Sequence, residues 1–182
     1  MKPDDRTGAG FYGKVRTHGD FVGRGLSAEF VAQWDAWLQR GLVAARERYG
    51  DDWLNRYLAM PVWRFAARRG AIAEDAHTGV LLPGIDAVGR YFPFAIARPV
   101  DGDACVPASS WHADAAALAL STLKPAFSLT EFEVSLTTLR VQSFGTASQA
   151  ADSEWWTEAG GVVHRHDGPL DAALFLHLLD AD

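Results

Sequence analysis

Two short stretches of this chain carry the residue types that acid–base chemistry needs. Asp86 and Arg90 lie in a loop between two apolar runs, and His18 and Asp20 lie in a turn near the N-terminus. Together with Arg64, these side chains could form a pocket in which carboxylates, an imidazole and guanidinium groups transfer a proton or hold a small ligand. The sequence therefore raises the hypothesis of a small hydrolase or ligand sensor that uses His18, Asp20, Asp86 and Arg90.

The same charged residues also fit a structural role, as ion pairs that hold two loops against a sheet. Charged side chains are tolerated inside a protein when they are paired and hydrogen-bonded. No G-x-S-x-G or H-E-x-x-H motif accompanies them in the sequence, so a nucleophile and a metal set are both missing from the pattern. We therefore favour a structural or interface role and keep the hydrolase or sensor as the alternative.

Glycine-rich phosphate-binding patterns match at the N-terminus but lack the necessary context. Residues 8–13 satisfy G-x-G-x-x-G, and residues 8–14 satisfy most of a P-loop. Such loops bind phosphate because a strand delivers them to the N-terminus of a helix. Here only a polar tail precedes Gly8, the following residues are typical of a strand, and the position of the Mg²⁺-binding hydroxyl is occupied by Val15. We expect no nucleotide cofactor.

The histidines and the cysteine do not form a recognisable metal or redox motif. His164 and His166 would share one face of an extended segment, but a catalytic zinc generally needs three protein ligands, and no other histidine is suitably spaced. Cys105 is the one cysteine of the chain, which is typical of a reducing compartment. We expect no metal, no cofactor and no catalytic residue.

Composition places the chain among ordinary globular proteins. It has 182 residues, 48% hydrophobic and 22% charged, with a formal net charge of −6 and seven tryptophans. The acidic balance makes nucleic acid an unsuitable partner, and no apolar run is long enough for a membrane span. We expect a flexible segment at 1–9 and one domain at 10–182, in a cytoplasmic protein. The sequence is compatible with both a monomer and a homodimer.

The central stretch, residues 79–97, is expected to form two strands joined by the loop that carries Asp86. Pro83 and Gly84 end the first strand because proline lacks an N–H group and glycine tolerates positive φ. Hydrophobic periodicity predicts further elements on both sides. The longest predicted helix is 28–49, which Ser27 begins and Gly50 ends; the other predicted helices are a short one capped by Asp51, 111–123, 129–139 and a last one that begins at Pro169. The predicted strands are 11–15, 62–66, 80–82, 91–97, 154–157 and 162–164. Polar connections are predicted at 74–78 and 98–103.

Several motifs follow one another in a specific order. They are Phe11-Tyr12-Gly13-Lys14, His18-Gly19-Asp20-Phe21, Trp34-Asp35-Ala36-Trp37-Leu38, Pro61-Val62-Trp63-Arg64-Phe65, Gly79-Val80-Leu81-Leu82-Pro83, Asp86-Ala87-Val88-Gly89-Arg90-Tyr91-Phe92-Pro93 and Trp155-Trp156-Thr157. This order resembles the TagF family, accessory proteins of bacterial type VI secretion. The resemblance runs from about Gly10 to about Leu179.

The resemblance implies a fold and a role. The pattern of helices and strands favours an α/β layered sandwich, and the resemblance implies a three-layer αβα sandwich, for which we expect a mixed sheet. It also implies no enzymatic activity, post-translational repression of type VI secretion assembly in the cytoplasm of a Gram-negative bacterium, and the forkhead-associated (FHA) scaffold protein of that system as the partner. Gly84 departs from the family pattern, in which we expect a serine after the proline.

A protein-binding surface needs exposed aromatic and charged groups on a rigid base. The candidate partner-binding residues come from the two loops and from the tryptophan pair near the C-terminus. They are His18, Asp20, Phe21, Asp86, Arg90, Tyr91, Trp155 and Trp156. Neighbouring side chains on a strand point to opposite faces, so we expect one of the two tryptophans in the core and the other at the surface.

Overall fold

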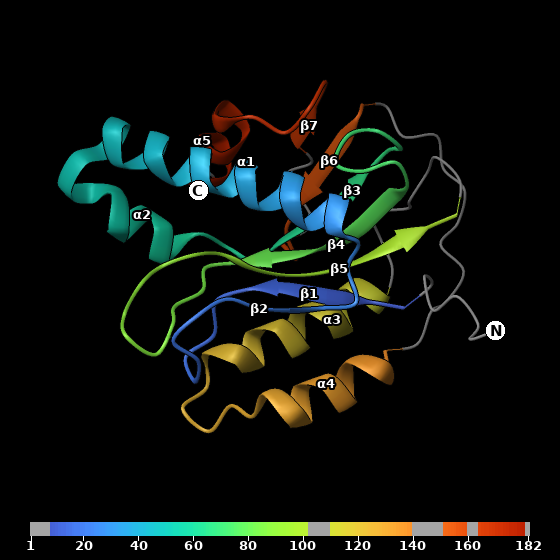
Figure 1. Ribbon diagram of the computed structural model, residues 1–182. Helices are drawn as coiled ribbons and strands as arrows, with labels where there is room; N and C mark the ends of the chain where they lie inside the picture. The colour runs from blue at the N-terminus through green and yellow to red at the C-terminus, as the bar shows by residue number, and fades with distance from the viewer. Residues whose placement is uncertain (1–7, 102–109, 140–150, 160–163, 181–182) are drawn as a thin grey trace.

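One seven-stranded sheet organises the protein. The computed structural model describes residues 8–101, 110–139, 151–159 and 164–180, and the strands follow the order β2-β1-β5-β4-β3-β6-β7 across the sheet (Figure 1). The strands are β1 (Gly10–Gly13), β2 (Val22–Arg24), β3 (Trp63–Ala67), β4 (Ala76–Leu82), β5 (Phe94–Val100), β6 (Ser153–Trp156) and β7 (His164–His166).

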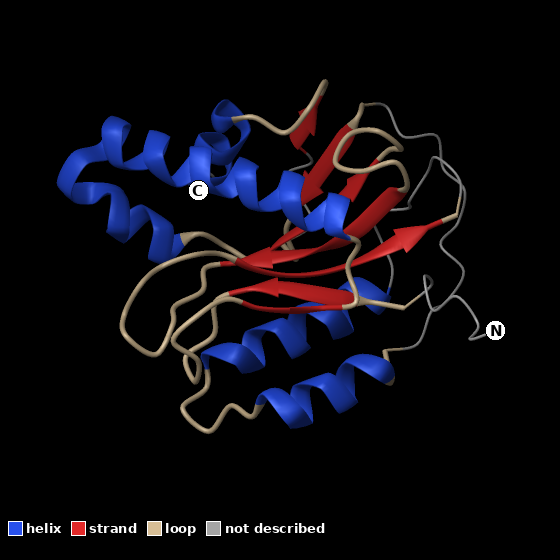
Figure 2. Ribbon diagram, viewed as in Figure 1, coloured by secondary structure: helices blue, strands red, loops and turns tan. Residues whose placement is uncertain are grey.

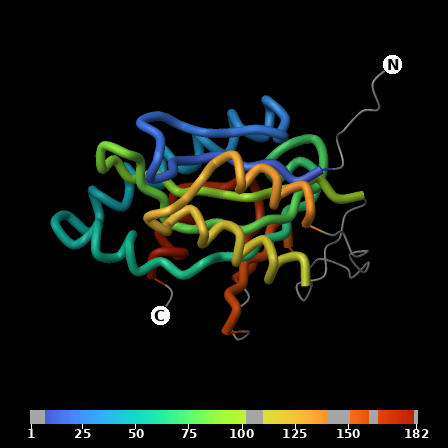
Figure 3. Tube along the Cα trace, turned by 90° about the horizontal axis from the view of Figure 1, so that it is seen from below, coloured from blue at the N-terminus to red at the C-terminus, as the bar shows by residue number. Residues whose placement is uncertain are grey.

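Helices lie on both faces of this sheet, so the α/β class predicted from the sequence is confirmed (Figure 2). The helices α1, α2 and α5 pack on one face, and α3 and α4 lie side by side across the other (Figure 3). Their bounds are α1 (Ala28–Tyr49), α2 (Trp53–Ala59), α3 (Ser110–Leu120), α4 (Leu129–Thr137) and α5 (Ala172–Leu179), with short 3₁₀ turns η1 (Gly50–Asp52) and η2 (Ser121–Leu123).

The expectation of a mixed sheet was wrong, because every strand pair in the described residues is antiparallel. Strands that follow each other directly, such as β3 and β4 or β4 and β5, are also neighbours in the sheet. Parallel neighbours would need long crossover connections. The helical segments α1–α2 and α3–α4 instead join strands that are not paired with each other. The order of helices and strands along the sequence does not distinguish these two arrangements.

Alternation along β4 shows how the sheet supports two cores. Leu81 joins the cluster beneath α1 and α5, whereas Val80 and Leu82 join the cluster beneath α3 and α4. A strand with both faces buried has apolar residues in succession rather than in alternation. This explains why residues 80–82 form an uninterrupted apolar run.

Aromatic side chains fill the core on the α1 face, as the seven tryptophans indicated. Trp34 lies 5.0 Å from Phe65 and 4.9 Å from Trp37 between ring centroids. Trp34, Trp37 and Trp63 are fully buried, and Trp53 packs against the same cluster. Because aromatic rings bury the largest areas of any side chains, this cluster contributes much of the hydrophobic stabilisation.

Helix α1 begins and ends where the sequence predicts. The Ser27 Oγ accepts a hydrogen bond from the Phe30 N–H at 3.1 Å, which caps the first turn. Gly50 ends the helix with a positive φ of 53°, a conformation that glycine adopts without strain.

Several other element boundaries differ from the prediction. Asp51 lies inside η1 and does not begin α2 as its cap. The cap of α5 is Asp171, whose Oδ1 accepts from the Leu174 N–H at 2.8 Å, so Pro169 precedes the helix. The predicted polar connections are shorter, because β4 already begins at Ala76 and β5 continues to Val100. Sheet pairing extends these strands through residues whose intrinsic strand propensity is low.

In the described ranges, no helix has the length and apolar character that crossing a membrane would require.

A prediction follows from the close approach of α1 and α5. A Cβ atom on Gly41 would lie 2.6 Å from the Phe175 Cδ1, closer than van der Waals contact allows. In an exposed helix, Gly→Ala stabilises by about 1 kcal/mol. Here we expect Gly41→Ala to lower the free energy of unfolding by about 2 kcal/mol through overpacking, as measured by urea denaturation.

The matched control for this prediction is a smaller side chain at position 175. In a Phe175→Ala background, Gly41→Ala should cost clearly less than in the wild type, because two of the three nearest clashing atoms, the Phe175 Cγ and Cδ1, are gone. If Gly41→Ala in the wild-type background instead raises the free energy of unfolding, α1 and α5 have room for a methyl group at position 41 and the prediction is wrong.

Candidate functional site

Two loops meet at one end of the sheet because the strands that carry them are paired. The connection 14–21 follows β1, and the connection 83–93 leads into β5. The register pairs Tyr12 with Ala95, so the end of β1 lies beside the start of β5. We call these two connections the paired-loop site.

Asp86 organises the second loop through its own side chain. Its Oδ1 accepts hydrogen bonds from the Val88 N–H at 3.0 Å and from the Arg90 N–H at 2.9 Å. Its backbone N–H donates to the Arg90 carbonyl at 2.9 Å. Gly89 has a φ of 85°, which permits the tight turn. An aspartate that bonds the backbone two residues ahead is a recognised turn-former, and here it closes the loop around its carboxylate.

Two cations complete the surroundings of this carboxylate. Lys14 Nζ lies 3.0 Å and Arg90 Nε 2.7 Å from Asp86 Oδ2. The side chain of Asp86 is fully buried, that of Lys14 is 9% exposed and that of Arg90 is 58% exposed. A buried carboxylate is stable when donors of this kind replace water. We call Lys14, Asp86 and Arg90 the ion triad.

Hydrogen bonding outweighs burial in setting the pKa of Asp86. Burial by itself raises the pKa of a carboxyl group, but the N–H groups of Arg90 and Val88 and the two cationic side chains hold the pKa of Asp86 far below its usual range. The group is therefore ionised at neutral pH.

The ion triad also ties the two loops to each other. Lys14 comes from the first loop and pairs with Asp86 of the second. The Ala87 N–H donates to the His18 carbonyl at 2.8 Å, and the Arg90 Nη2 donates to the Gly19 carbonyl. The arrangement fixes the tip of one loop against the tip of the other.

The predicted residues of the two loops do come together, but not as an acid–base pocket. The Asp20 Oδ1 accepts from the Phe21 N–H, and the His18 Nδ1 lies 2.9 Å from the Thr17 Oγ1. Both side chains therefore make local contacts, whereas Asp86 bonds within the ion triad. Tyr91 packs against Trp53 with ring centroids 6.2 Å apart.

Arg64 lies outside this site. It is part of β3, and its charge acts on His112 of α3, where burial first and Arg64 second lower the pKa of the imidazole to about 4. The proposed membership of Arg64 in the cluster with Asp86 has no support in these contacts.

The late tryptophan pair is buried on both faces of the sheet. Trp155 has an exposed fraction of 0% and Trp156 of 5%. Trp155 packs on Phe65 in the α1-side core, and Trp156 lies 5.0 Å from His112 on the other face. The expectation that one of the two faces solvent was wrong, because helices cover both faces of the sheet at β6. Neither ring is exposed to a partner in this structure.

Sequence reasoning missed Lys14 and Tyr57. Lys14 appeared as part of a rejected P-loop pattern, yet it is the buried partner of Asp86. A single acid between apolar runs requires a nearby base, and that requirement was the available signal. The Tyr57 hydroxyl donates to the Gly84 carbonyl and accepts from the Gly84 N–H, both at 2.8 Å, so α2 fixes the start of the second loop.

The glycine at position 84 has a structural explanation. A Cβ atom there would lie 2.7 Å from the Lys14 carbonyl oxygen and would also clash with the Phe92 carbonyl oxygen. The serine expected from the family resemblance would not fit this backbone. Gly84 allows the two loops to approach each other closely.

The structure places the residues of two of the rejected motifs. The phosphate-binding pattern runs directly into β1, with no helix after it. His164 stacks on His177 with ring centroids 3.7 Å apart, and the described part of the chain contains no group of three or more metal-binding side chains. Cys105 lies outside the described residues.

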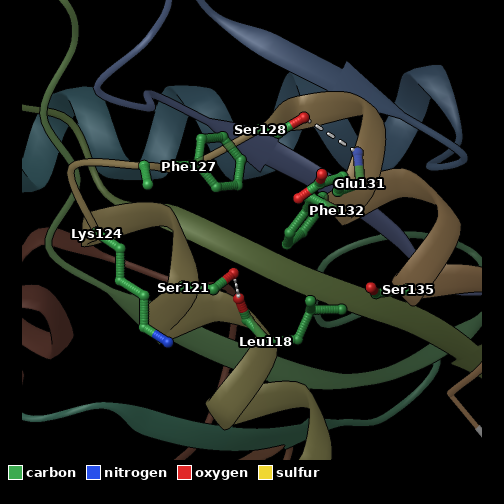
Figure 4. Close-up of a pocket in the computed structure, with 9 residues that line it drawn as sticks. Leu118, Ser121, Lys124, Phe127, Ser128, Glu131, Phe132 and Ser135 are labelled. Atoms are coloured by element: carbon green, nitrogen blue, oxygen red, sulfur yellow. Dashed lines mark hydrogen bonds between the residues drawn. The ribbon is translucent and has the colours of Figure 1, made fainter.

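A separate hollow of about 270 Å³ lies between the end of α3 and the start of α4 (Figure 4). Two serine hydroxyls of its lining make hydrogen bonds to the backbone of the chain. The Ser121 Oγ donates to the Leu118 carbonyl, and the Ser128 Oγ accepts from the Glu131 N–H. None of the predicted site residues lines it.

Fold and site together define an α/β protein with one antiparallel sheet, in which a buried Lys14–Asp86 ion pair fixes two surface loops. Comparison with known proteins agrees with this description. A family model described as the TagF N-terminal domain, type VI secretion system-associated, matches residues 10–139. The chain belongs to the TagF family.

A solved structure shows the same fold in a relative. PA0076 from Pseudomonas aeruginosa PAO1, known from a crystal structure, is 33% identical, and the match covers 94% of this chain and 93% of that one with a TM-score of 0.83. No curated protein matches the chain. The family resemblance identified from the motif order is thereby confirmed, and with it the association with type VI secretion.

The ion triad yields a stability prediction. We expect Asp86→Asn to lower the free energy of unfolding by about 3 kcal/mol at neutral pH, because Lys14 then stays buried without its counter-charge. Asp20→Asn is the matched control, since Asp20 is an exposed aspartate of the same site and should change stability by less than about 0.5 kcal/mol. Equal effects of the two substitutions would contradict a structural role for the triad.

The pH dependence of the same variant distinguishes charge from packing. The pKa of Asp86 is lower in the folded protein than in the unfolded chain, where it is about 3.9. Its stabilising contribution is therefore fully present above about pH 5 and is lost as the pH falls below about 4 towards the folded-state pKa. The difference between wild type and Asp86→Asn should be constant from pH 8 to pH 5 and shrink below pH 4.

Proposed function

We propose that the protein is a non-enzymatic, post-translational repressor of type VI secretion assembly. It acts in the cytoplasm of a Gram-negative bacterium by binding the FHA-domain scaffold protein of that system. Membership of the TagF family supports the connection to type VI secretion. The repressor role and the partner are what the family resemblance implies, and the paired-loop site is the surface through which we propose that binding occurs.

The observation that carries this proposal is the exposed rim around the buried Lys14–Asp86 ion pair. Val88 at the tip of the second loop is 69% exposed, Phe21 is 36% exposed and the side chain of Arg90 is 58% exposed. These groups combine apolar contact area with a fixed charge. Because Asp86 and Lys14 hold the loops from beneath, little conformational freedom is lost when a partner binds.

Phe21 is held in place by further contacts. Its ring stacks on Tyr12 at 5.5 Å, and Lys14 Nζ lies 5.1 Å from the ring centroid. A rigid, partly exposed aromatic ring is typical of an interface anchor.

The alternative, a hydrolase or ligand sensor built on His18, Asp20, Asp86 and Arg90, is less well supported. Asp86 accepts four hydrogen bonds within the chain, which leaves its carboxylate little capacity for a substrate. Its lowered pKa also makes it a poor proton donor or acceptor near neutral pH. These two facts favour an interface.

The proposal is tested with the FHA scaffold protein encoded in the same secretion cluster. Binding is measured by pull-down and then by calorimetry for wild type, Val88→Asp and Arg90→Ala. We expect both substitutions to weaken binding at least about ten-fold, because each changes the rim of the paired-loop site.

The matched control is Val43→Asp. Val43 is 52% exposed on α1, so the substitution introduces the same charge elsewhere on the surface and should leave affinity unchanged. Thermal unfolding of each variant separates loss of contact from loss of fold. Absence of binding by folded wild-type protein would refute the partner, and loop variants that bind like the wild type would refute the surface.

A further inference from the structure

The free edge of β2 has the features of a peptide-docking site. We propose that an extended segment of a partner protein adds to this edge as an eighth strand, with apolar and acidic side chains in alternation. This inference concerns the surface next to the paired-loop site, with which it shares Phe21 and His18, and it does not require the FHA scaffold protein to be the partner.

Among the described residues, the outer side of β2 has no strand partner. β2 stands at one end of the strand order and pairs with β1 through Gly23 and Tyr12 (Figure 1). Within the described ranges, no strand pairs with its other side, and Gly23 and Arg24 are exposed. Along an antiparallel strand the backbone groups alternate between the two neighbours, so about half of them point away from β1. Such an edge is a template for an added strand.

A hollow of about 210 Å³ adjoins this edge on the α1 face of the sheet. Tyr12, Leu26 and Val31 line it together with Gly23. Gly23 has no side chain to fill the space, and a Cβ there would already lie 3.0 Å from the Tyr12 Cδ2. The lining is largely apolar, so the hollow suits an aliphatic side chain of the added strand.

A second hollow, of about 270 Å³, adjoins the same edge on the α4 face. Phe11 and Leu129 form part of it, and His18 and Arg24 add polar nitrogen atoms. The Arg24 side chain is 72% exposed and pairs with Glu133, its Nε 3.0 Å from one carboxylate oxygen. A guanidinium group has five N–H donors, so Arg24 retains donors for a further carboxylate. This hollow suits an acidic side chain.

The two hollows match the side-chain alternation of a strand. Successive residues of an added strand point to opposite faces of the sheet, and Phe21, Val22, Gly23 and Arg24 line both hollows. An aliphatic residue followed by an acidic residue would therefore occupy one hollow each. Main-chain bonding would supply affinity and the two hollows would supply selectivity.

A second copy of this chain fits the edge less well. In a symmetric antiparallel pairing of two β2 strands, Gly23 would stand opposite Gly23, and directly opposite residues share a face. The copy would then bring no side chain to the hollow on the α1 face. On the other face it would bring Arg24 rather than a carboxylate. The occupant that matches both hollows is a peptide of different sequence.

Selection from a phage-displayed library of random heptapeptides on the immobilised full-length chain tests this inference. We expect enrichment of peptides in which aliphatic and acidic residues alternate. A synthetic copy of the most enriched peptide should perturb the backbone amides of Val22–Arg24 in a ¹⁵N NMR spectrum and slow their hydrogen exchange.

Matched variants report on each hollow separately. Val31→Phe fills the hollow on the α1 face and should weaken binding of the synthetic peptide at least ten-fold. Val43→Phe makes the same change at an exposed position of α1 and should leave this affinity unchanged. Arg24→Glu should shift selection from acidic to basic residues. Because Arg24 is exposed, this variant keeps the fold even where Val31→Phe does not.

Three results would overturn the inference. They are the absence of any enriched pattern on the wild type, enriched peptides whose binding neither Val31→Phe nor Arg24→Glu alters, and a wild-type dimer in analytical ultracentrifugation whose β2 amides are protected without peptide. The FHA scaffold protein takes no part in these measurements, so their failure and that of the proposed function are separate results.

Discussion

The buried carboxylate of Asp86 is the constraint on which the two joined loops at one end of the sheet depend. An ionised group that loses its water must regain an equivalent set of donors from the protein, or the fold becomes unstable. Here those donors come from the Arg90 and Val88 backbone, from the Arg90 side chain and from Lys14 of the neighbouring loop. Since the donors belong to two loops, satisfying one charge fixes the position of both.

The antiparallel sheet makes this arrangement possible. Lys14 follows β1 directly and Asp86 precedes β5 by a short loop, and the pairing of β1 with β5 brings both to one end of the sheet. Close backbone approach at Gly84 and the Tyr57 hydroxyl then bring the loops into contact. Strand β1 also pairs with the edge strand β2, so the paired-loop site and the outer edge of β2 lie next to each other. Phe21 borders both surfaces.

The sequence predicted helix and strand boundaries best where the boundary depends on the side chains of a few neighbouring residues. Ser27 and Gly50 mark the ends of α1 because capping and positive φ are properties of those residues themselves. The apolar run 80–82 and the order of motifs were likewise sufficient for a buried strand and for the family. The direction of neighbouring strands was not predictable in this way, because hairpins and crossovers can have similar sequences of helices and strands.

For the candidate site, the sequence by itself determined which residues required partners. One acid between apolar runs, with an arginine four positions later, had to be paired if it was buried, and the two loops were grouped because their charged side chains could form a pocket or an ion-pair network. The tertiary structure decided the rest: that Lys14 is the buried partner, that His18 and Asp20 stay outside the triad, and that Trp155 and Trp156 are both covered. The physical reason is that burial and pairing are properties of the space between segments. Lys14 and Asp86 are 72 positions apart, and no local preference reports which distant segment the chain will fold against.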